Sequence, residues 1–193
     1  MIQTFAAYLG ERFRPRVFVP AILGLTSGAV ASVDAAPTAF STVPALVLMG
    51  LLVLQYRVWD DLEDLDRDRR VHPCRVLVRA QPAPFWWAVV ILGLVGARLI
   101  HELTAAGSPA LATYFCLIMA AFVAYRVIRE FVSACAWSQW ILLAKYPAFV
   151  AVVALTLGPV SPARLVVFSV LAFATAHLYE RAHTRAAEPR VSR

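Results

Sequence analysis

One short segment, WDDLEDLDRDRRVHPCRVL (residues 59–77), holds half of the acidic side chains of this chain: six of the 12 Asp and Glu residues lie within nine consecutive positions. Asp61, Asp64 and Asp68 are spaced i, i+3 and i+7, so a helix would present them on one face, with Asp60 beside them. Like charges this close repel each other, and a divalent cation relieves the repulsion. Carboxylate oxygens are the ligands that Mg²⁺ prefers, and substrate phosphates complete its coordination shell. The segment therefore predicts a Mg²⁺–phosphate site formed by Asp60, Asp61, Asp64 and Asp68.

A solvated loop is the alternative interpretation of the same segment. In that case the acids would pair with neighbouring arginines, because most charge runs are solvated faces. The spacing on one helical face and the position beside an apolar block favour the metal–phosphate interpretation. The arginines in question are Arg67, Arg69, Arg70, Arg75 and Arg79.

The rest of the chain shows what must position this segment. Of its 193 residues, 61% are hydrophobic and only 16% are charged, whereas about a quarter of residues are charged in soluble proteins. The apolar residues form long blocks separated by short polar loops. This composition predicts an all-α integral membrane protein, a single domain over residues 1–193 with about six membrane-spanning helices. The expected spans are approximately 17–33, 43–59, 84–101, 109–127, 132–158 and 162–180.

The connecting loops alternate in charge. Arginines precede the first span, fill the 57–80 loop, flank the turn after residue 126 and recur in the tail, whereas the loops at 34–42, 102–108 and 158–162 contain no Lys or Arg. Because basic loops stay in the cytoplasm, this alternation places both termini and the acidic segment inside the cell, in a multi-pass protein of the inner (plasma) membrane. The arginines are scattered over short loops and form no single basic face, which argues against binding of nucleic acid.

The fifth expected span is unusual. Over 132–158 it would be about 40 Å long as a helix, against a hydrocarbon core of about 30 Å. It contains Lys145, the only lysine of the chain, followed closely by Pro147, so a kink or break is expected there. An ionisable side chain at that depth is a functional candidate. Lys145 is therefore a candidate catalytic residue that binds phosphate or pairs with a carboxylate; snorkelling to the interface is the structural alternative.

Three motifs together resemble the UbiA superfamily of intramembrane prenyltransferases. The run Asp60-Asp61-x-x-Asp64-x-x-x-Asp68, followed by His72-Pro73-x-Arg75-x-Leu77, is similar to the first aspartate-rich motif of that family. Tyr8…Arg12-x-Arg14-Pro15 resembles its N-terminal signature, and Tyr125-x-x-x-Arg129 resembles its Y-x-x-x-K/R element. The resemblance extends from about Tyr8 to Arg185.

The resemblance implies a prenyltransferase that uses a Mg²⁺-bound isoprenyl diphosphate as donor and a lipophilic acceptor, both reached from the membrane lipid. Metal and cations would stabilise the departing diphosphate, and an apolar aromatic pocket would protect the allylic cation. Asp61, Asp64 and Asp68 would be catalytic metal ligands, with Asp60 in the first position of the motif. Arg14, Arg75 and Arg129 would contact the diphosphate.

The chain also departs from this family pattern. Members typically have nine spans and a second aspartate motif after the sixth, whereas this chain reads HLYERAHTR at residues 177–185, where Glu180 offers one carboxylate to a metal. Three alternatives remain open: six helices suffice, a second copy or a partner subunit supplies the missing helices, or the protein is a non-catalytic membrane subunit that binds a lipid diphosphate or a partner protein. A terpene cyclase of the same superfamily is a further alternative.

Overall fold

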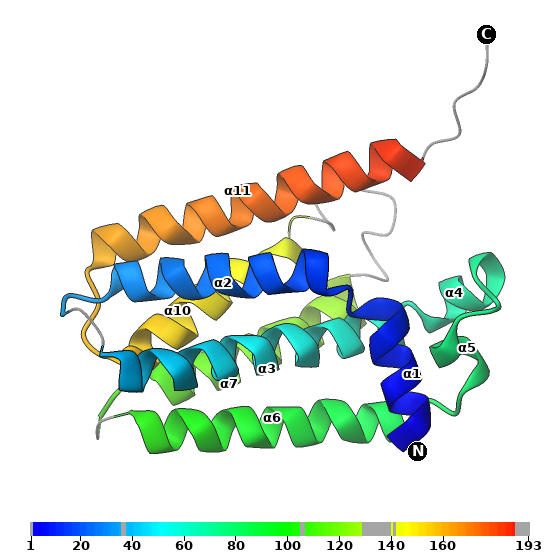
Figure 1. Ribbon diagram of the computed structural model, residues 1–193, viewed down its shortest axis with the longest axis horizontal. Helices are drawn as coiled ribbons and strands as arrows, with labels where there is room; N and C mark the ends of the chain where they lie inside the picture. Colours follow the sequence, from blue (N-terminus) through cyan, green and yellow to red (C-terminus); the bar gives the residue numbers. More distant parts are fainter. Residues whose placement is uncertain (1, 36–37, 105–106, 129–139, 141, 188–193) are drawn as a thin grey trace, which may run out of the picture.

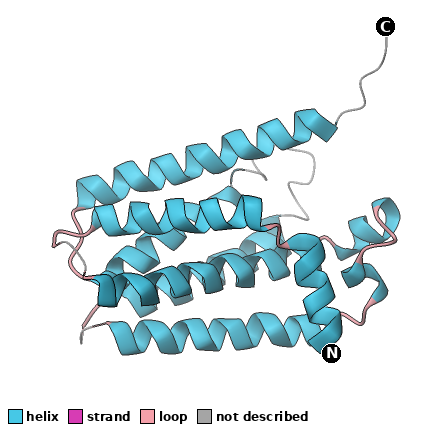
Figure 2. Cartoon of the chain, viewed as in Figure 1, coloured by secondary structure: helices cyan, strands magenta, loops and turns pink. Residues whose placement is uncertain are grey.

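The protein is a bundle of helices in a computed structural model that describes residues 2–35, 38–104, 107–128, 140 and 142–187 (Figure 1). Within these ranges there is no strand, only an isolated bridge between Val33 and Val160 (Figure 2). The helices are α1 (Ile2–Arg12), α2 (Pro15–Ser32), α3 (Ala39–Glu63), α4 (Leu65–Val71), α5 (Val76–Arg79), α6 (Ala83–Leu103), α7 (Ala110–Val123), α10 (Lys145–Leu157) and α11 (Pro162–Ala187), with a π-helical turn, η1 (Ala124–Ile128), after α7.

Four helices are long and apolar enough to cross a membrane: Pro15–Ser32, Ser41–Glu63, Ala83–Leu103 and Pro162–Ala182. This confirms an all-helical protein with membrane-spanning helices. The other two expected spans coincide with shorter apolar helices. The span expected at 109–127 corresponds to α7 and η1, and α10 covers the end of the one expected at 132–158. Most of the first half of that fifth span lies outside the described residues.

The break expected in the fifth span is confirmed. The backbone turns at Ala144, and α10 begins at Lys145 with Pro147 in its first turn. A proline is tolerated there because the first N–H groups of a helix have no partner within it. The break places Lys145 at a helix N-terminus instead of mid-helix.

Helix α3 is central to the bundle and contacts α2, α6 and α10 (Figure 1). Its buried face carries large apolar side chains, and α10 contributes Phe149 and neighbouring valines to the same core. One set of buried polar groups is hydrogen-bonded across the core. The Tyr114 hydroxyl of α7 donates to Gln55 Oε1 of α3 at 2.8 Å and lies 3.1 Å from the carbonyl of Gly93 of α6. This network links three helices where water has no access.

The two ends of the bundle differ. At one end α1 lies across the helix ends, beside α4 and α5, and the last turns of α11 point to the same end (Figure 1). At the other end the chain after α2 pairs with the chain before α11 through Asp34 N to Pro159 O at 3.0 Å and Ser161 N to Ser32 O at 2.9 Å. Arg164 adds an ion pair with Asp34 at 2.7 Å. The acidic segment therefore belongs to the end that holds α1.

The Gly93 contact can be tested by substitution. A Cβ at Gly93 would lie 2.8 Å from Gln55 Nε2, whereas a Cβ at Gly50 of α3 would meet nothing within 4 Å. We expect Gly93→Ala to destabilise the protein by about 1–3 kcal/mol, because Gln55 must move away from its buried partner Tyr114. Gly50→Ala is the matched control and should be neutral or stabilising, since alanine favours a helix. Equal melting temperatures of the two variants in detergent would contradict this packing.

Candidate functional site

The acidic segment is not one continuous helix. Helix α3 ends at Glu63, Asp64 lies at the junction, and α4 begins at Leu65. The expectation that a single helix carries Asp61, Asp64 and Asp68 on one face is therefore wrong. Asp61 and Asp68 nevertheless border one small pocket, whereas the Asp60 carboxylate contacts residues of η1 and α10.

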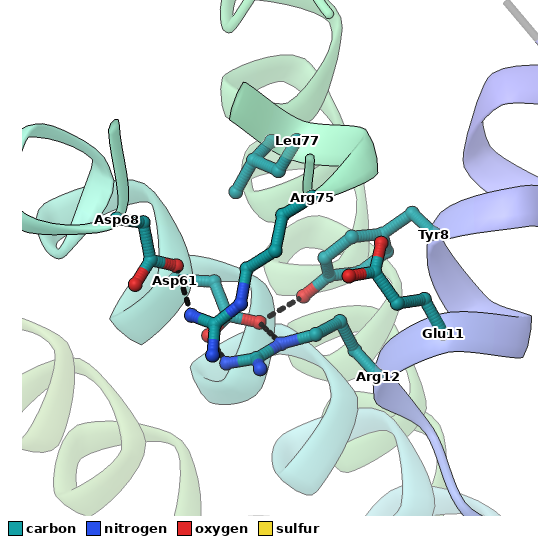
Figure 3. A pocket seen from close by; sticks show the side chains of 7 residues that line it. All are labelled: Tyr8, Glu11, Arg12, Asp61, Asp68, Arg75 and Leu77. Atoms are coloured by element: carbon teal, nitrogen blue, oxygen red, sulfur yellow. Dashed lines mark hydrogen bonds and ion pairs between the residues drawn. The ribbon is translucent and has the colours of Figure 1, made fainter. Parts of the chain in front are cut away.

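Asp61 is the most enclosed carboxylate of the segment, with its side chain 4% exposed. Arg12 of α1 approaches it with two nitrogens: Nε donates to Oδ2 at 2.9 Å, and Nη2 donates to Oδ1. The Tyr8 hydroxyl donates to Oδ2 at 2.8 Å (Figure 3). Arg57 Nη2 lies 3.2 Å from Oδ1. The Asp61 carboxylate thus holds Tyr8 and Arg12, which precede it in the sequence by 53 and 49 positions.

The protonation of the two α1 side chains suits this arrangement. Burial raises the pKa of the Tyr8 phenol, and the Asp61 carboxylate raises it further, so Tyr8 keeps its proton and donates. Burial acts to lower the pKa of Arg12, but its hydrogen bond and charge interaction with Asp61 outweigh burial, and the pKa is raised. Arg12 therefore remains a cation.

Asp60 is held on the other side of α3. Its Oδ2 accepts from Lys145 Nζ at the start of α10, and its Oδ1 accepts from the Tyr125 hydroxyl of η1. The π-helical turn and the break before α10 place these two donors at one carboxylate, and such π-helical turns are frequent at functional sites. Lys145 thus pairs with a carboxylate, one of the two contacts expected for it, and its catalytic role stays a prediction.

The third ion pair joins Asp68 of α4 to Arg75, seven residues later. Arg75 lies just before α5, and Glu11 of α1 accepts a hydrogen bond from the neighbouring Val76 N–H at 2.8 Å. Figure 3 shows Arg75 reaching toward Asp68 and Arg12 reaching toward Asp61. The side chains around them leave no space for a water molecule; they are Tyr8, Glu11, Arg12, Asp61, Asp68, Arg75 and Leu77.

A shallow open depression adjoins this closed pocket. It has a volume of about 430 Å³ and shares Glu11 and Arg75 with the pocket. Its remaining lining comes from the α4–α5 connection, Val71, His72, Pro73 and Cys74. Glu11 and Arg75 therefore border both the closed pocket and the open depression.

Aromatic rings lie on the Asp60 side of α3. Trp59 is buried, with ring centroids 5.7 Å from Tyr56 and 5.4 Å from Tyr125. Phe149 of α10 contacts Tyr56 and Tyr146 edge to face, with centroids 5.1 and 5.8 Å apart. An apolar aromatic wall thus continues from the polar end of the bundle into its core.

The structure brings together only part of the expected site. Asp60, Asp61, Asp68, Arg75 and Lys145 all lie at this end in ion pairs. Asp64 is half-buried between α3 and α4. Arg14 is exposed at the start of α2, Glu180 is exposed on α11, and Arg129 lies outside the described residues.

Four residues of this site received no role from the sequence: Tyr8, Arg12, Arg57 and Tyr125. For three of them, the spacing in the sequence could have indicated a shared helical face. Tyr8 and Arg12 are four residues apart, so they share one helical face, and Arg57 precedes Asp61 by four on α3. Tyr125 belongs to a motif of which only the arginine had been given a function.

The residues do not fit a metal centre in this arrangement. Among the described residues no three His, Cys, Asp or Glu side chains are grouped so that they could hold a metal ion. Mg²⁺ needs several oxygen ligands in octahedral geometry at about 2.1 Å. Asp60, Asp61 and Asp68 instead direct oxygens toward separate cations. The magnesium ligands expected from the sequence stay a prediction.

No protein-family model, curated protein or solved structure matches this chain. The apolar helices and the ion pairs themselves define the class: a helical membrane protein with a polar, ion-paired site at one end of the bundle.

Asp61 and Asp66 provide a matched test of this geometry. Asp61→Asn leaves Arg12 and Arg57 without their counter-charge in a buried site, so we expect a loss of about 3–5 kcal/mol of unfolding free energy. Asp66 is 88% exposed and pairs with Arg69 on the same helix, so Asp66→Asn should change stability by less than about 0.5 kcal/mol. Denaturant titration in detergent measures both. Equal losses would contradict the burial of Asp61.

The Asp60–Lys145 pair can be tested by a double-mutant cycle. Asp60→Asn and Lys145→Met should each destabilise the protein, and the double variant should lose less than their sum, with a coupling energy of about 1 kcal/mol or more. The control cycle uses Arg98 and Glu102, an exposed pair on α6, where coupling of about 0.3–0.5 kcal/mol is expected. Additive effects at Asp60 and Lys145 would contradict their contact.

Proposed function

We propose that this protein is a UbiA-like intramembrane prenyltransferase, which holds the diphosphate of an isoprenyl donor at the ion-paired end of the bundle and transfers the prenyl group to a lipophilic acceptor. The observation that carries the proposal is the gathering of cations. Arg12, Arg57, Arg75 and Lys145 come from four separate segments and meet around three aspartates at the end of an apolar bundle. The motif resemblance supports the same function.

The cations suit a leaving diphosphate. When the bond between the first prenyl carbon and the diphosphate oxygen breaks, both electrons remain on that oxygen, and nearby guanidinium and ammonium groups stabilise the charge. Arginine is suited to this role because its planar group donates two parallel hydrogen bonds to phosphate, as Arg12 does to Asp61.

The aromatic wall suits the other half of the reaction. An allylic cation is stabilised by the faces of Tyr and Trp rings, and Tyr56, Trp59 and Tyr125 lie next to Asp60 and α10. A nucleophilic atom of the acceptor then bonds to the first prenyl carbon, and the proton that the acceptor loses passes to the departing diphosphate. The apolar core excludes water, which would otherwise capture the cation.

The proposed orientation places the site in the cytoplasm. Most arginines of the described chain, including Arg14, Arg16 and those of α4, lie at the same end as α1, which supports a cytoplasmic position for this end under the positive-inside rule. The donor would reach the site with its diphosphate at the cytoplasmic surface and its prenyl chain in the membrane.

A non-catalytic protein that binds the same lipid diphosphate is the second candidate. The closed pocket favours it, because the side chains around Arg12 and Asp61 leave no volume for a ligand until they move. Release of inorganic diphosphate from farnesyl diphosphate separates the two, measured with the protein in a membrane extract that supplies lipophilic acceptors. Release above the buffer rate supports the transferase, and binding without release supports the subunit.

Arg75→Gln tests the diphosphate site. We expect it to weaken binding of farnesyl thiolodiphosphate, a slowly hydrolysed donor analogue, by about tenfold or more, since a charge-assisted hydrogen bond contributes about 1.5–3 kcal/mol. The matched control is Arg98→Gln, an exposed arginine of α6 that should bind like the wild type. Isothermal titration calorimetry in nanodiscs measures both. Equal affinity of the two variants would contradict a diphosphate site at Arg75.

A further inference from the structure

The carboxylates of Asp60 and Asp61 already have hydrogen-bond and ion-pair partners within the protein. Asp61 accepts from Tyr8 and Arg12 and pairs with Arg57, while Asp60 accepts from Lys145 and Tyr125. A Mg²⁺ ion bound to Asp61 and Asp68 would compete with Arg12, Arg57 and Arg75 for the same carboxylate oxygens. Leaving a buried charge without its partner is strongly unfavourable. The aspartates act here as counter-ions that hold cations in place.

The cations, by contrast, retain unused donors. A guanidinium has five N–H donors. Arg57 uses Nη2 toward Asp61, whereas its Nε is buried and has no acceptor among the described residues. Arg75 uses Nη1 toward Asp68, and its side chain remains 24% exposed. An anion could therefore share these arginines with the aspartates without displacing them.

The open depression gives an anion access to Arg75. Arg75 borders both the depression and the closed pocket, so a phosphate in the depression meets Arg75 first. His72 also lines the depression. Glu11 is its one carboxylate, and Glu11 Oε2 is engaged by the Val76 N–H at 2.8 Å. The volume of about 430 Å³ is large enough for a diphosphate group.

From these contacts we propose that the site binds diphosphate directly through its own cations, without a divalent metal. Arg75 receives the diphosphate from the depression, and Arg57, which lines neither the depression nor the closed pocket, supplies its unused Nε when the side chains around Asp61 move. Asp61 and Asp68 keep these two arginines in place. This inference rests on the proposed function and names how the same site recognises its ligand.

The experiment is titration of farnesyl thiolodiphosphate into the full chain in nanodiscs, with excess EDTA and, separately, with Mg²⁺. The expected result is binding in EDTA with a Kd within about twofold of the value in Mg²⁺, and competition by inorganic diphosphate. Binding that occurs only with Mg²⁺ would overturn this inference and leave the proposed function intact. Binding in neither condition would overturn the proposed function itself.

Arg57→Lys provides the second variant. It keeps a positive charge opposite Asp61, so the protein is expected to fold, but it removes the unused Nε donor. We expect binding to weaken several-fold in EDTA and in Mg²⁺ alike, while Arg98→Lys, the matched control, binds like the wild type. Unchanged affinity of Arg57→Lys would overturn the assignment of this arginine to the diphosphate.

Discussion

The structure depends on one electrostatic constraint: carboxylates at the end of an apolar helix need cations close by, because solvation there is too thin to support them alone. Asp60 and Asp61 are adjacent residues in the last turn of helix α3. Successive residues of a helix point about 100° apart. The two carboxylates therefore face different neighbours, and each recruits its own cation.

This constraint explains how distant segments are assembled. Asp61 fixes α1 across the bundle end through Arg12 and Tyr8, and Asp60 fixes the start of α10 and the π-helical turn through Lys145 and Tyr125. At the opposite end, backbone hydrogen bonds and the exposed Arg164–Asp34 ion pair join the chain after α2 to the chain before α11. Among the described residues, the buried charges thus lie at one end only, which is where a charged ligand would meet the apolar core.

The sequence predicts the apolar helices well because their length and composition are local properties. The expected spans 17–33, 84–101 and 162–180 begin within about two residues of α2, α6 and α11. The turn before Lys145 was also foreseeable, because Pro147 restricts the backbone locally.

The pairing of charges was not foreseeable from local pattern. Nothing near Asp60 indicates that its partner lies 85 residues later. The spacing places Asp60 beside Asp61 and Asp68, whereas the structure pairs it with α10, away from the pocket that those two aspartates share. The resemblance directed attention to Arg14, whereas Arg12 lies on the face of α1 that also carries Tyr8 and so reaches Asp61. Spacing identifies a helical face but does not identify what packs against it.

Hydrogen–deuterium exchange of α1 in nanodiscs, compared between the wild type and Arg12→Gln, tests most directly whether buried ion pairs assemble this end of the protein. If the Arg12–Asp61 contact holds α1 on the bundle, the backbone amides of Ile2–Arg12 should exchange much faster in the variant, while those of α6 stay protected. Unchanged protection of α1 would contradict the claim that buried ion pairs assemble this end of the protein.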